Sequence, residues 1–457
     1  MIPVAIVGGG ITGLSAAWYL SRAGVRSVVW ERQPRLGGVI VTDAVDGCLV
    51  EGGPDSFLAA KPWAMDLIRE LGLAPEVIGS NDHLRVTYVR RGGRLIALPD
   101  GLMMMVPTRV MPLLRSRLLS WPAKARMGLE WFRWKKPDAP DRSVAEFIID
   151  HYGREALEYL AEPLLAGVYG GDPGELSAAS VLPRLVDFER HYGSLTRGVL
   201  LEGGRTAGTL GGGSLFRTLQ GGLGRLVEAL ERALGQWMEV RRGEVEAIET
   251  TPFGFRLRAG GDWHAAARVL LACPAWEAAR LVRGLDGRLA DRLEAIPYTS
   301  SMTVALGYER AALAHPLDGF GFLVPRRERR RLVACTWVGT KFNDRVAADR
   351  ALLRCFLGGA GDPAVLAEPD ERVVASVRSE IADIMGVTAE PLFARIRRWP
   401  RSMAQYTVGH QARLEEIERR ASAIEGLALA GNAYHGIGIP DCVQSGRVAA
   451  ERLAAAC

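Results

Sequence analysis

Three glycines near the start of the chain, Gly8, Gly10 and Gly13, have the spacing of a G-x-G-x-x-G motif. An apolar strand pattern over residues 4–7 precedes them, and a helical pattern over residues 14–23 follows. In this context the first glycine makes a tight turn, the second lets a pyrophosphate touch the backbone, and the third lets helix and strand pack closely. The positive end of the helix then faces the phosphates. The motif therefore predicts a dinucleotide site, and a simple glycine turn between packed elements is the alternative.

An acidic residue follows this motif at the distance that ribose recognition requires. A second strand pattern over residues 27–30 ends at Glu31, whose carboxylate can accept hydrogen bonds from ribose hydroxyls. An acid at this position disfavours a 2′-phosphate. NAD and FAD both bind to such a strand–helix–strand unit, so the choice between them depends on residues further along the chain.

Additional glycine turns favour FAD. Residues 35–38 (RLGG) resemble the E-x-x-x-R-x-G-G extension of the flavin amine oxidase superfamily, counted from Glu31. At the far end of the chain, Gly431 precedes the turn 436–441, and a helix is expected from Cys442 to Leu453. The positive end of that helix would face an anionic flavin ring. Anchors roughly 400 residues apart predict an extended FAD bound by a discontinuous domain.

Five longer motifs resemble those of the protoporphyrinogen oxidase family, including its bacterial branch that oxidises coproporphyrinogen. They are Glu51 to Phe57 (EGGPDSF), Glu162 to Asp172 (EPLLAGVYGGD), Thr218 to Leu226 (TLQGGLGRL), Gln405 to His410 (QYTVGH) and Gly431 to Gly446 (GNAYHGIGIPDCVQSG). The resemblance covers almost the whole chain. It implies that FAD takes six electrons from a porphyrinogen to make a porphyrin of the heme pathway, and that molecular oxygen reoxidises the flavin.

The resemblance also implies which residues contact FAD. Glu31 and Arg32 would hold the adenosine ribose, and Val245 would meet the adenine through its backbone, although the sequence alone favours an ordinary strand residue at 245. The full set of expected cofactor-binding residues is Gly8, Gly9, Gly10, Ile11, Thr12, Gly13, Glu31, Arg32, Gly37, Gly38, Val39, Gly53, Pro54, Asp55, Ser56, Val245, Gly431, Ile437, Gly438 and Ile439.

A second set of residues is implied for the substrate, because a flat tetrapyrrole needs apolar and aromatic walls. The set is Asn81, Gly167, Phe320, Gly321, Leu323, Thr336 and Phe356. Ordinary core positions are the alternative for the apolar members. Asn81 stands where some family members carry an arginine for a substrate propionate, so another basic residue would have to anchor the carboxylates. We assign no catalytic acid or base and no metal ligand, because no Ser-His-Asp, Cys-His, paired-carboxylate or zinc pattern is evident.

These signals predict an α/β fold with an α+β substrate domain. A Rossmann-type FAD-binding domain of the flavin amine oxidase type is expected in three parts, 1–80, 206–290 and 401–457. The substrate domain is expected in two parts, 81–100 and 291–400, with a helical, membrane-facing subdomain over 101–205.

The segment 101–136 suggests a membrane contact. Its aromatic and sulfur side chains are Met103, Met104, Met105, Trp121, Trp131 and Trp134. Its charges are Arg109, Arg115, Arg117, Lys124, Arg126, Arg133, Lys135 and Lys136 against Glu130 alone, which is eight minus one, or +7. Such a mixture suits the headgroup layer of an anionic membrane. A packed helical subdomain with a solvated basic face is the alternative, and both interpretations stay open.

The composition limits the remaining function classes. The whole chain has 57 basic and 52 acidic residues, a net charge of +5 that is too small to indicate a nucleic-acid protein. Six cysteines without a C-x-x-C pattern, and no signal-peptide pattern, predict a cytoplasmic protein, peripheral on the inner face of the cell membrane if the segment 101–136 binds lipid. The oligomeric state stays open.

Protoporphyrinogen IX is the preferred substrate, because it carries two carboxylates and the predicted walls are apolar. Coproporphyrinogen III, with four carboxylates, is the alternative within the family. Two other classes stay open: a related flavin desaturase or amine oxidase, and a non-catalytic, membrane-docked porphyrin-binding flavoprotein.

Overall fold

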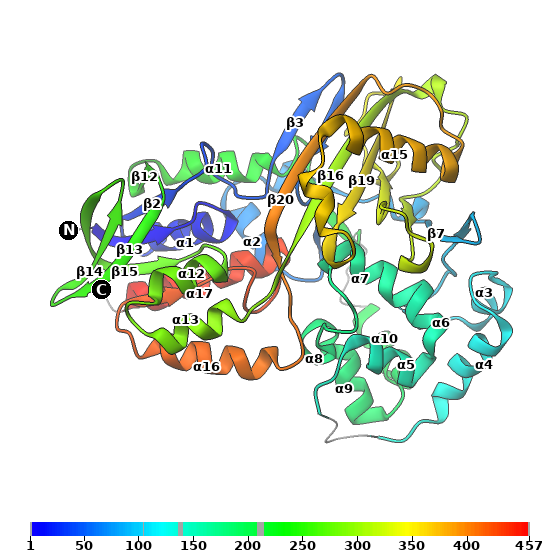
Figure 1. The fold of residues 1–457 in the computed structure, drawn as a ribbon, viewed down its shortest axis with the longest axis horizontal. Helices are drawn as coiled ribbons and strands as arrows, with labels where there is room; N and C mark the ends of the chain where they lie inside the picture. Colours follow the sequence, from blue (N-terminus) through cyan, green and yellow to red (C-terminus); the bar gives the residue numbers. More distant parts are fainter. Residues whose placement is uncertain (1, 104, 136–139, 208–213, 456–457) are drawn as a thin grey trace.

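The computed structural model describes residues 2–103, 105–135, 140–207 and 214–455, with side chains omitted for 203–207 (Figure 1). Met104, Lys136 and Cys457 therefore lie outside the described residues. Figure 1 shows two sheets side by side, with a group of helices below the second sheet.

The first sheet contains a parallel array of five strands in the order β12, β2, β1, β15 and β21. Their bounds are β1 (Ile2–Val7), β2 (Ser27–Glu31), β12 (Met238–Arg242), β15 (Asp262–Leu271) and β21 (Leu427–Leu429). A hairpin of β13 (Val245–Thr251) and β14 (Gly254–Ala259) pairs antiparallel with the first half of β15. The glycine motif follows β1, as the sequence predicts.

Helices cover both faces of this sheet, which explains why β1 is apolar throughout. Val4 and Ile6 pack with one layer of helices, whereas Ala5 and Val7 pack into the opposite core. A parallel strand buried on both faces is expected to read as a continuous apolar run. The first layer comprises α1 (Ile11–Arg22), α2 (Trp63–Glu70), α11 (Gly224–Leu234) and α17 (Ile439–Ala455). The second comprises α12 (Ala275–Val282), α13 (Gly287–Glu294) and α16 (His410–Ser422).

The second sheet has the strand order β20, β16, β19, β18, β17, β7 and β8, and only the β17–β7 pair is parallel. Its strands are β7 (Thr87–Arg91), β8 (Arg94–Ala97), β16 (Tyr298–Glu309), β17 (Gly321–Leu323), β18 (Ala334–Trp337), β19 (Arg350–Gly358) and β20 (Phe393–Ala404). The alternating pattern of residues 84–98 around Gly92-Gly93 predicts a hairpin, and the structure has this hairpin as β7–β8. The helix α15 (Asp370–Met385) packs Val373, Val377 and Ile381 onto this sheet.

The helical group lies between residues 110 and 207. Its helices are α3 (Val110–Arg115), α4 (Trp121–Leu129), α5 (Val144–Tyr152), α6 (Arg154–Ala156), α7 (Glu162–Tyr169), α8 (Ala178–Val181), α9 (Pro183–Tyr192) and α10 (Leu195–Ala207). Ser143 and Glu146 form a capping box that starts α5. The sequence pattern predicts helices over residues 143–166 with a break at Pro163. In the structure α7 begins at Glu162 after a π-helical turn, η4 (Leu157–Ala161). Proline is tolerated there because the first turn of a helix leaves its N–H groups unpaired.

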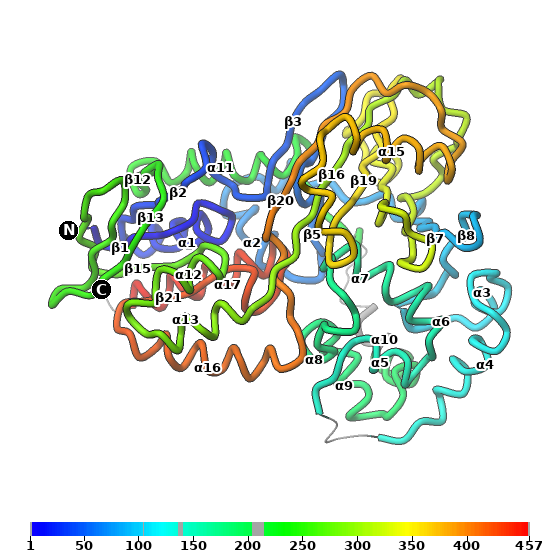
Figure 2. Tube along the Cα trace, viewed as in Figure 1, coloured from blue at the N-terminus to red at the C-terminus, as the bar shows by residue number. Residues whose placement is uncertain are grey.

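Several short elements lie outside the two large sheets. They are β3 (Thr42–Val45), β4 (Cys48–Glu51), β5 (Phe57–Leu58), β6 (Val77–Gly79), β9 (Leu102–Met103), β10 (Val106–Pro107), β11 (Phe216–Leu219) and α14 (Val338–Lys341). The tube in Figure 2 shows the first and last parts of the chain, blue and red, lying side by side. In the described part of the chain, every helix is too short or too polar to cross a membrane.

Candidate cofactor and substrate cavity

A cavity of about 830 Å³ lies where the first sheet, the second sheet and α7 meet. Most of the predicted site residues line it. Those on the cofactor side are Gly10, Ile11, Thr12, Gly37, Val39, Gly53, Pro54, Asp55, Ser56, Gly431, Ile437, Gly438 and Ile439. Those on the substrate side are Gly167, Phe320, Gly321, Leu323, Thr336 and Phe356. The structure thus gathers into one space residues from both ends of the chain.

Eight predicted site residues do not line this cavity: Gly8, Gly9, Gly13, Glu31, Arg32, Gly38, Val245 and Asn81. Asn81 is the only one of them from the substrate set. Its side-chain nitrogen donates to the Thr340 carbonyl and to Asn343 Oδ1, both at 3.0 Å. Asn81 therefore holds the turn after α14 in place.

The glycines of the motif have different structural roles. A Cβ on Gly13 would lie 2.0 Å from the carbonyl oxygen of Gly8, so Gly13 is required for the packing of α1 on β1. A Cβ on Gly10 would meet nothing closer than Gly38 Cα at 3.9 Å, because Gly10 faces the open cavity. Gly10 is also the N-cap of α1 and supplies no capping side chain. This open, cationic helix end fits an anionic pyrophosphate.

Glu31 and Arg32 lie at the end of β2 and do not line the cavity. Glu31 accepts hydrogen bonds from the backbone nitrogens of Gly9 and Gln33, both at 2.8 Å, and so fixes the glycine turn. Arg32 pairs with Glu277 at 3.0 Å. Arg280 on the same helix, α12, donates to the Val245 carbonyl at 2.8 Å. Arg32 and Val245 therefore lie next to the same ion-paired helix.

The second sheet contributes a charged cluster to the cavity wall. Lys341 Nζ lies 2.8 Å from Asp55 Oδ2, and Arg354 Nη1 lies 3.7 Å from the same oxygen. Arg354 also donates to the Gly53 carbonyl. Burial opposes ionisation of Asp55, but Lys341 and Arg354 hold the pKa of this carboxyl well below its usual range. The sequence reasoning missed both basic residues, because no local pattern connects them to a motif about 300 positions earlier.

A second ion pair connects the beginning and the end of the chain across the cavity. Lys61 Nζ lies 2.6 Å from Asp441 Oδ1 and 2.8 Å from Oδ2. Asp441 stands in the first turn of α17, where a carboxylate is favoured by the helix dipole. A Cβ on Gly436 would meet the Asp441 carboxylate at 2.4 Å, and the φ of Gly436 is +143°. This turn therefore requires glycine.

The substrate side of the cavity is mainly apolar. Phe320, which precedes β17, and Phe356 of β19 lie on it, and Leu323 of β17 faces Gly167 of α7. Gly321 has a φ of +132°, and a Cβ there would lie 1.9 Å from the Cys335 carbonyl. Among the described residues that line the cavity there is no histidine. The walls can hold a flat apolar molecule, and they place no general base of that type against it.

The mouth of the cavity carries charged side chains from α7 and from the loop after β17. Glu162 accepts from Arg329 Nη2 at 2.8 Å and from the backbone nitrogen of Arg326 at 3.0 Å. Arg326 Nη1 donates to Asp172 Oδ2 at 2.7 Å. All four side chains line the cavity. The sequence reasoning did not single out these two arginines, because they lie in an unremarked run of basic residues, 326–331.

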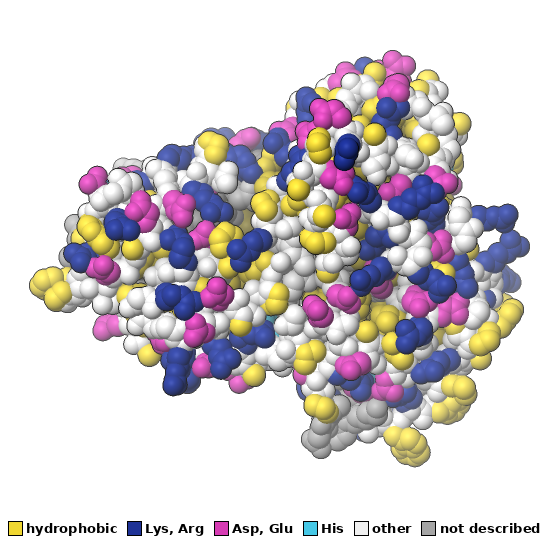
Figure 3. Space-filling model, viewed as in Figure 1, with side chains coloured by type: hydrophobic (Ala, Val, Ile, Leu, Met, Phe, Trp, Pro, Cys, Tyr) yellow, Lys and Arg dark blue, Asp and Glu magenta, His cyan; other side chains and the backbone are white. Residues whose placement is uncertain are grey.

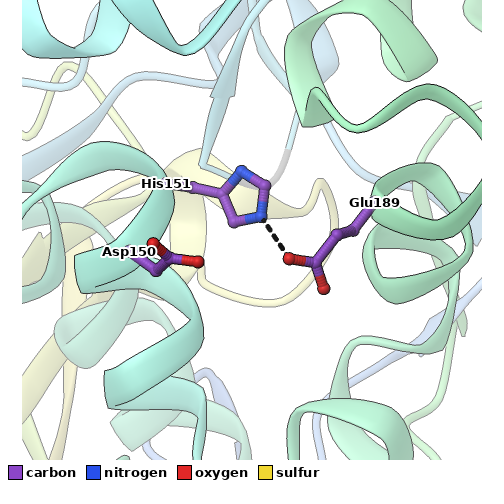
Figure 4. A group of neighbouring side chains, drawn as sticks. All are labelled: Asp150, His151 and Glu189. Atoms are coloured by element: carbon purple, nitrogen blue, oxygen red, sulfur yellow. Dashed lines mark hydrogen bonds and ion pairs between the residues drawn. The ribbon is translucent and has the colours of Figure 1, made fainter. Parts of the chain in front are cut away.

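A different polar cluster lies inside the helical group. His151 of α5 and Glu189 of α9 point toward each other, with Asp150 nearby (Figure 4). His151 Nε2 lies 3.1 Å from Glu189 and Nδ1 lies 2.8 Å from Glu130. Glu189 is also paired with Arg142 at 2.6 Å. Because these groups satisfy one another, we interpret the cluster as an internal ion network of the helical group.

Known proteins resemble this chain over nearly its full length. The family described as flavin containing amine oxidoreductase matches residues 11–454. The coproporphyrinogen III oxidase of Bacillus subtilis (strain 168) is 32% identical over 98% of this chain and 96% of that protein. The corresponding enzyme of Propionibacterium freudenreichii is 35% identical over 98% and 90%. Protoporphyrinogen oxidase 2, chloroplastic/mitochondrial, of Arabidopsis thaliana is 24% identical over 98% and 93%.

Solved structures show the same fold. A crystal structure from Exiguobacterium sp. 255-15, provisionally named a protoporphyrinogen oxidase, is 32% identical, has a TM-score of 0.89, and covers 100% of this chain and 99% of that one. The cyclohexylamine oxidase of Brevibacterium oxydans is 19% identical with a TM-score of 0.73, covering 100% and 99%. The latter supports the fold alone.

Proposed function

Because the chain belongs to the flavin containing amine oxidoreductase family, whose cofactor is FAD, we propose that it is an oxygen-using porphyrinogen oxidase of heme biosynthesis. The observation that carries the proposal is the continuity of the cavity. Its open helix end at Gly10 suits the FAD pyrophosphate, and its other side is a chamber walled by Phe320, Leu323 and Phe356. The names of the relatives and the apolar walls of the cavity give less support to a related amine oxidase or desaturase, or to a porphyrin-binding protein without catalysis.

The reaction removes six electrons and six protons from a porphyrinogen and reduces three oxygen molecules to three hydrogen peroxides. Bound FAD supplies the hydride acceptor and the reaction with oxygen. The chain's own residues would hold and orient the two molecules. The N–H groups at the start of α1 would bind the pyrophosphate, and Gly431 with Ile437 to Ile439 would lie along the flavin ring. The apolar walls would keep water from the macrocycle and hold it flat against the flavin.

The site proposal extends to the predicted residues that lie behind the cavity. Glu31 and Arg32 would serve the adenosine ribose, and Val245 the adenine. We also retain the division into a three-part FAD-binding domain, a two-part substrate domain and a helical subdomain as a proposal. It is supported by the way the chain leaves the first sheet after β2, re-enters it at β12, leaves it again after β15 and returns at β21.

Protoporphyrinogen IX is the proposed substrate, because the chamber is mainly apolar and this molecule carries only two carboxylates. Coproporphyrinogen III is the second candidate, and one observation favours it. The sequence reasoning expected little fixed positive charge in the cavity, yet Lys61, Arg326, Arg329, Lys341 and Arg354 line it. Each of these cations is paired with an acid of the chain, but they provide polar positions for additional carboxylates. The names of the bacterial relatives point the same way.

The FAD-loaded protein is expected to convert both porphyrinogens to fluorescent porphyrins in air, consuming three oxygen molecules per porphyrin. The measurement is porphyrin fluorescence together with oxygen uptake, with protoporphyrinogen IX and coproporphyrinogen III assayed side by side. A parallel assay with cyclohexylamine is the control. A yellow, folded protein that oxidises the amine and neither porphyrinogen would refute the proposal. A yellow protein that binds porphyrin but oxidises nothing would favour the non-catalytic alternative.

We further propose that the helical group contacts anionic membranes. Trp121, Phe132 and Trp134 of the segment 101–136 are 69%, 73% and 89% exposed. Figure 3 shows such hydrophobic side chains, in yellow, along the edge of the helical group among basic ones. Lys124 is a correction to the expected basic face: it is buried, and its Nζ donates to the Leu114 and Ser116 carbonyls at 2.9 and 2.7 Å. Part of the segment therefore packs, as the alternative interpretation expects.

Replacing exposed basic residues of this segment is expected to weaken vesicle binding. Each exposed Lys or Arg contributes about 1 kcal/mol at an anionic surface, so Arg115→Gln with Arg117→Gln should reduce binding at low salt by more than tenfold. Co-sedimentation with phosphatidylserine vesicles measures it, and added salt should reduce the difference. Phe253→Ser is the matched control, because Phe253 is 79% exposed at the tip of the β13–β14 hairpin. Wild-type protein that stays in the supernatant would leave only the packed-subdomain interpretation.

A further inference from the structure

Arg326 is the basic residue of the cavity that is best placed to meet a ligand from solvent. It begins η7 (Arg326–Glu328), separated by two residues from the end of β17, and the residues of β17 form an apolar wall of the cavity. Its side chain is 58% exposed, whereas the side chain of Arg329 is 11% exposed. Of its three guanidinium nitrogens, Nη1 alone has a hydrogen-bond partner among the described residues, namely Asp172. The other two nitrogens are available as donors.

The surroundings fix the backbone of Arg326 and leave its side chain adjustable. Its backbone nitrogen donates to Glu162 Oε2 at 3.0 Å, and Glu162 Oε1 accepts from Arg329 Nη2 at 2.8 Å. Arg329 also donates twice to the Val324 carbonyl, from Nε at 3.2 Å and from Nη2 at 3.0 Å. Glu162 and Arg329 therefore fasten the loop to the start of α7. Because its guanidinium is already hydrogen-bonded to Glu162 and to the Val324 carbonyl, Arg329 has a structural role.

The counter-ion of Arg326 is held in its ionised form. Asp172 is partly buried, which opposes ionisation, but the Gly174 backbone nitrogen and Arg326 hold the pKa of this carboxyl below its usual range. Asp172 Oδ1 is occupied by Gly174 at 2.8 Å, so only Oδ2 faces Arg326. A guanidinium held by one oxygen can present a second pair of N–H groups to another carboxylate, because its donors form a planar fork.

We propose that Arg326 recognises a propionate carboxylate of the porphyrinogen at the mouth of the cavity, with Asp172 orienting the guanidinium. The inference rests on the proposed function and specifies the carboxylate contact that Asn81 does not provide. The macrocycle would lie between α7 and the wall formed by Phe320 and Leu323. Its acidic edge would then point outward to Arg326, so that no carboxylate enters the apolar part of the chamber unpaired.

The test uses FAD-loaded protein and three variants. Arg326→Ala is expected to raise KM for coproporphyrinogen III about tenfold with little change in kcat, the size of one lost charge-assisted contact. Arg326→Lys, which keeps the charge but loses the fork, is expected to recover part of the loss. Arg327→Ala is the matched control, because Arg327 is 56% exposed, pairs with Glu158 at 2.6 Å and does not line the cavity. Its KM should equal that of the wild type.

Two additional measurements distinguish a substrate-binding role of Arg326 from a structural one. Equilibrium binding of coproporphyrin III, followed by its fluorescence, should weaken in Arg326→Ala by the same factor as KM. The salt dependence of KM should also become weaker in that variant, because one charge pair is gone. An unchanged KM in Arg326→Ala would overturn the subsite while leaving the oxidase intact. A wild-type protein that oxidises no porphyrinogen would instead overturn the proposed function.

Discussion

A Gly10→Val variant is expected to fold and to purify without FAD. The added Cβ would find no protein atom closer than 3.9 Å, so the fold tolerates it. The rest of the valine side chain, however, would occupy the cavity space in front of the α1 N-terminus, where the pyrophosphate must approach the backbone. The flavin content per protein, from absorbance, should fall from near one to near zero, while circular dichroism keeps the wild-type shape.

Gly13→Val provides the contrast for this experiment. Its Cβ would lie 2.0 Å from the Gly8 carbonyl oxygen, so that variant is expected to lose stability as well as flavin. Gly72→Ala is the mild control, because a Cβ there meets nothing within 4 Å, although its φ of +74° makes the alanine slightly strained. A folded Gly10→Val protein with normal flavin occupancy would refute the assignment of the pyrophosphate site.

Replacing Arg345 by leucine is expected to lower the free energy of unfolding by about 3 kcal/mol. Arg345 is 2% exposed and connects the segment between α14 and β19 to β4 and β11. Its Nη1 donates to Glu51 at 2.9 Å, and its Nη2 donates to the Leu219 carbonyl at 2.9 Å and to Thr218. Burial already raises the pKa of Glu51 despite this partner, so without Arg345 the carboxyl becomes easier to protonate, which limits the loss.

Urea unfolding of the two proteins at pH 7 measures this difference. Arg350→Leu is the matched control, because Arg350 pairs with Asp46 and Asp349 near the surface and is 24% exposed. Surface pairs of this type contribute about 1 kcal/mol or less. Equal stabilities for Arg345→Leu and Arg350→Leu would contradict the central position that we assign to the buried pair.

The elements that the sequence predicted well are those whose signals are local. The strand–glycine–helix unit at residues 4–23 appears as β1 and α1. The glycine turn at residues 221–222 and the apolar spacing after it also predict a helix over residues 224–234, and α11 has the same bounds. In both, the apolar spacing and the glycine turns lie within one short window of the chain. The alternating apolar pattern predicts a strand over residues 238–249, but the structure has two strands there, β12 and β13, which pair with different neighbours. A turn at Gly243 separates them, and the apolar pattern did not reveal it.

The polar half of the cavity was not predictable in the same way. Asp55 meets Lys341 and Arg354 only because β19 and α14 of the second sheet are brought against the turn after β4. Charged residues that pair from positions so far apart in the chain produce no recognisable local pattern in the sequence. Lys124 illustrates the converse: a lysine in a basic, aromatic segment was expected at the surface, but two carbonyls inside the helical group bind it.

The close packing of α1 against α17 has a consequence for the order in which the protein matures. A Cβ on Gly446 of α17 would lie 2.4 Å from the Thr12 carbonyl oxygen, so the two helices pack backbone to backbone beside Thr12, which lines the cavity. Residues 2–31 leave the ribosome more than 400 residues before α17 is complete. At about 5–20 residues per second, this delay lasts roughly 20–80 seconds. The apolar face of α1 must therefore be shielded during synthesis, and the complete flavin site can form only after translation of α17.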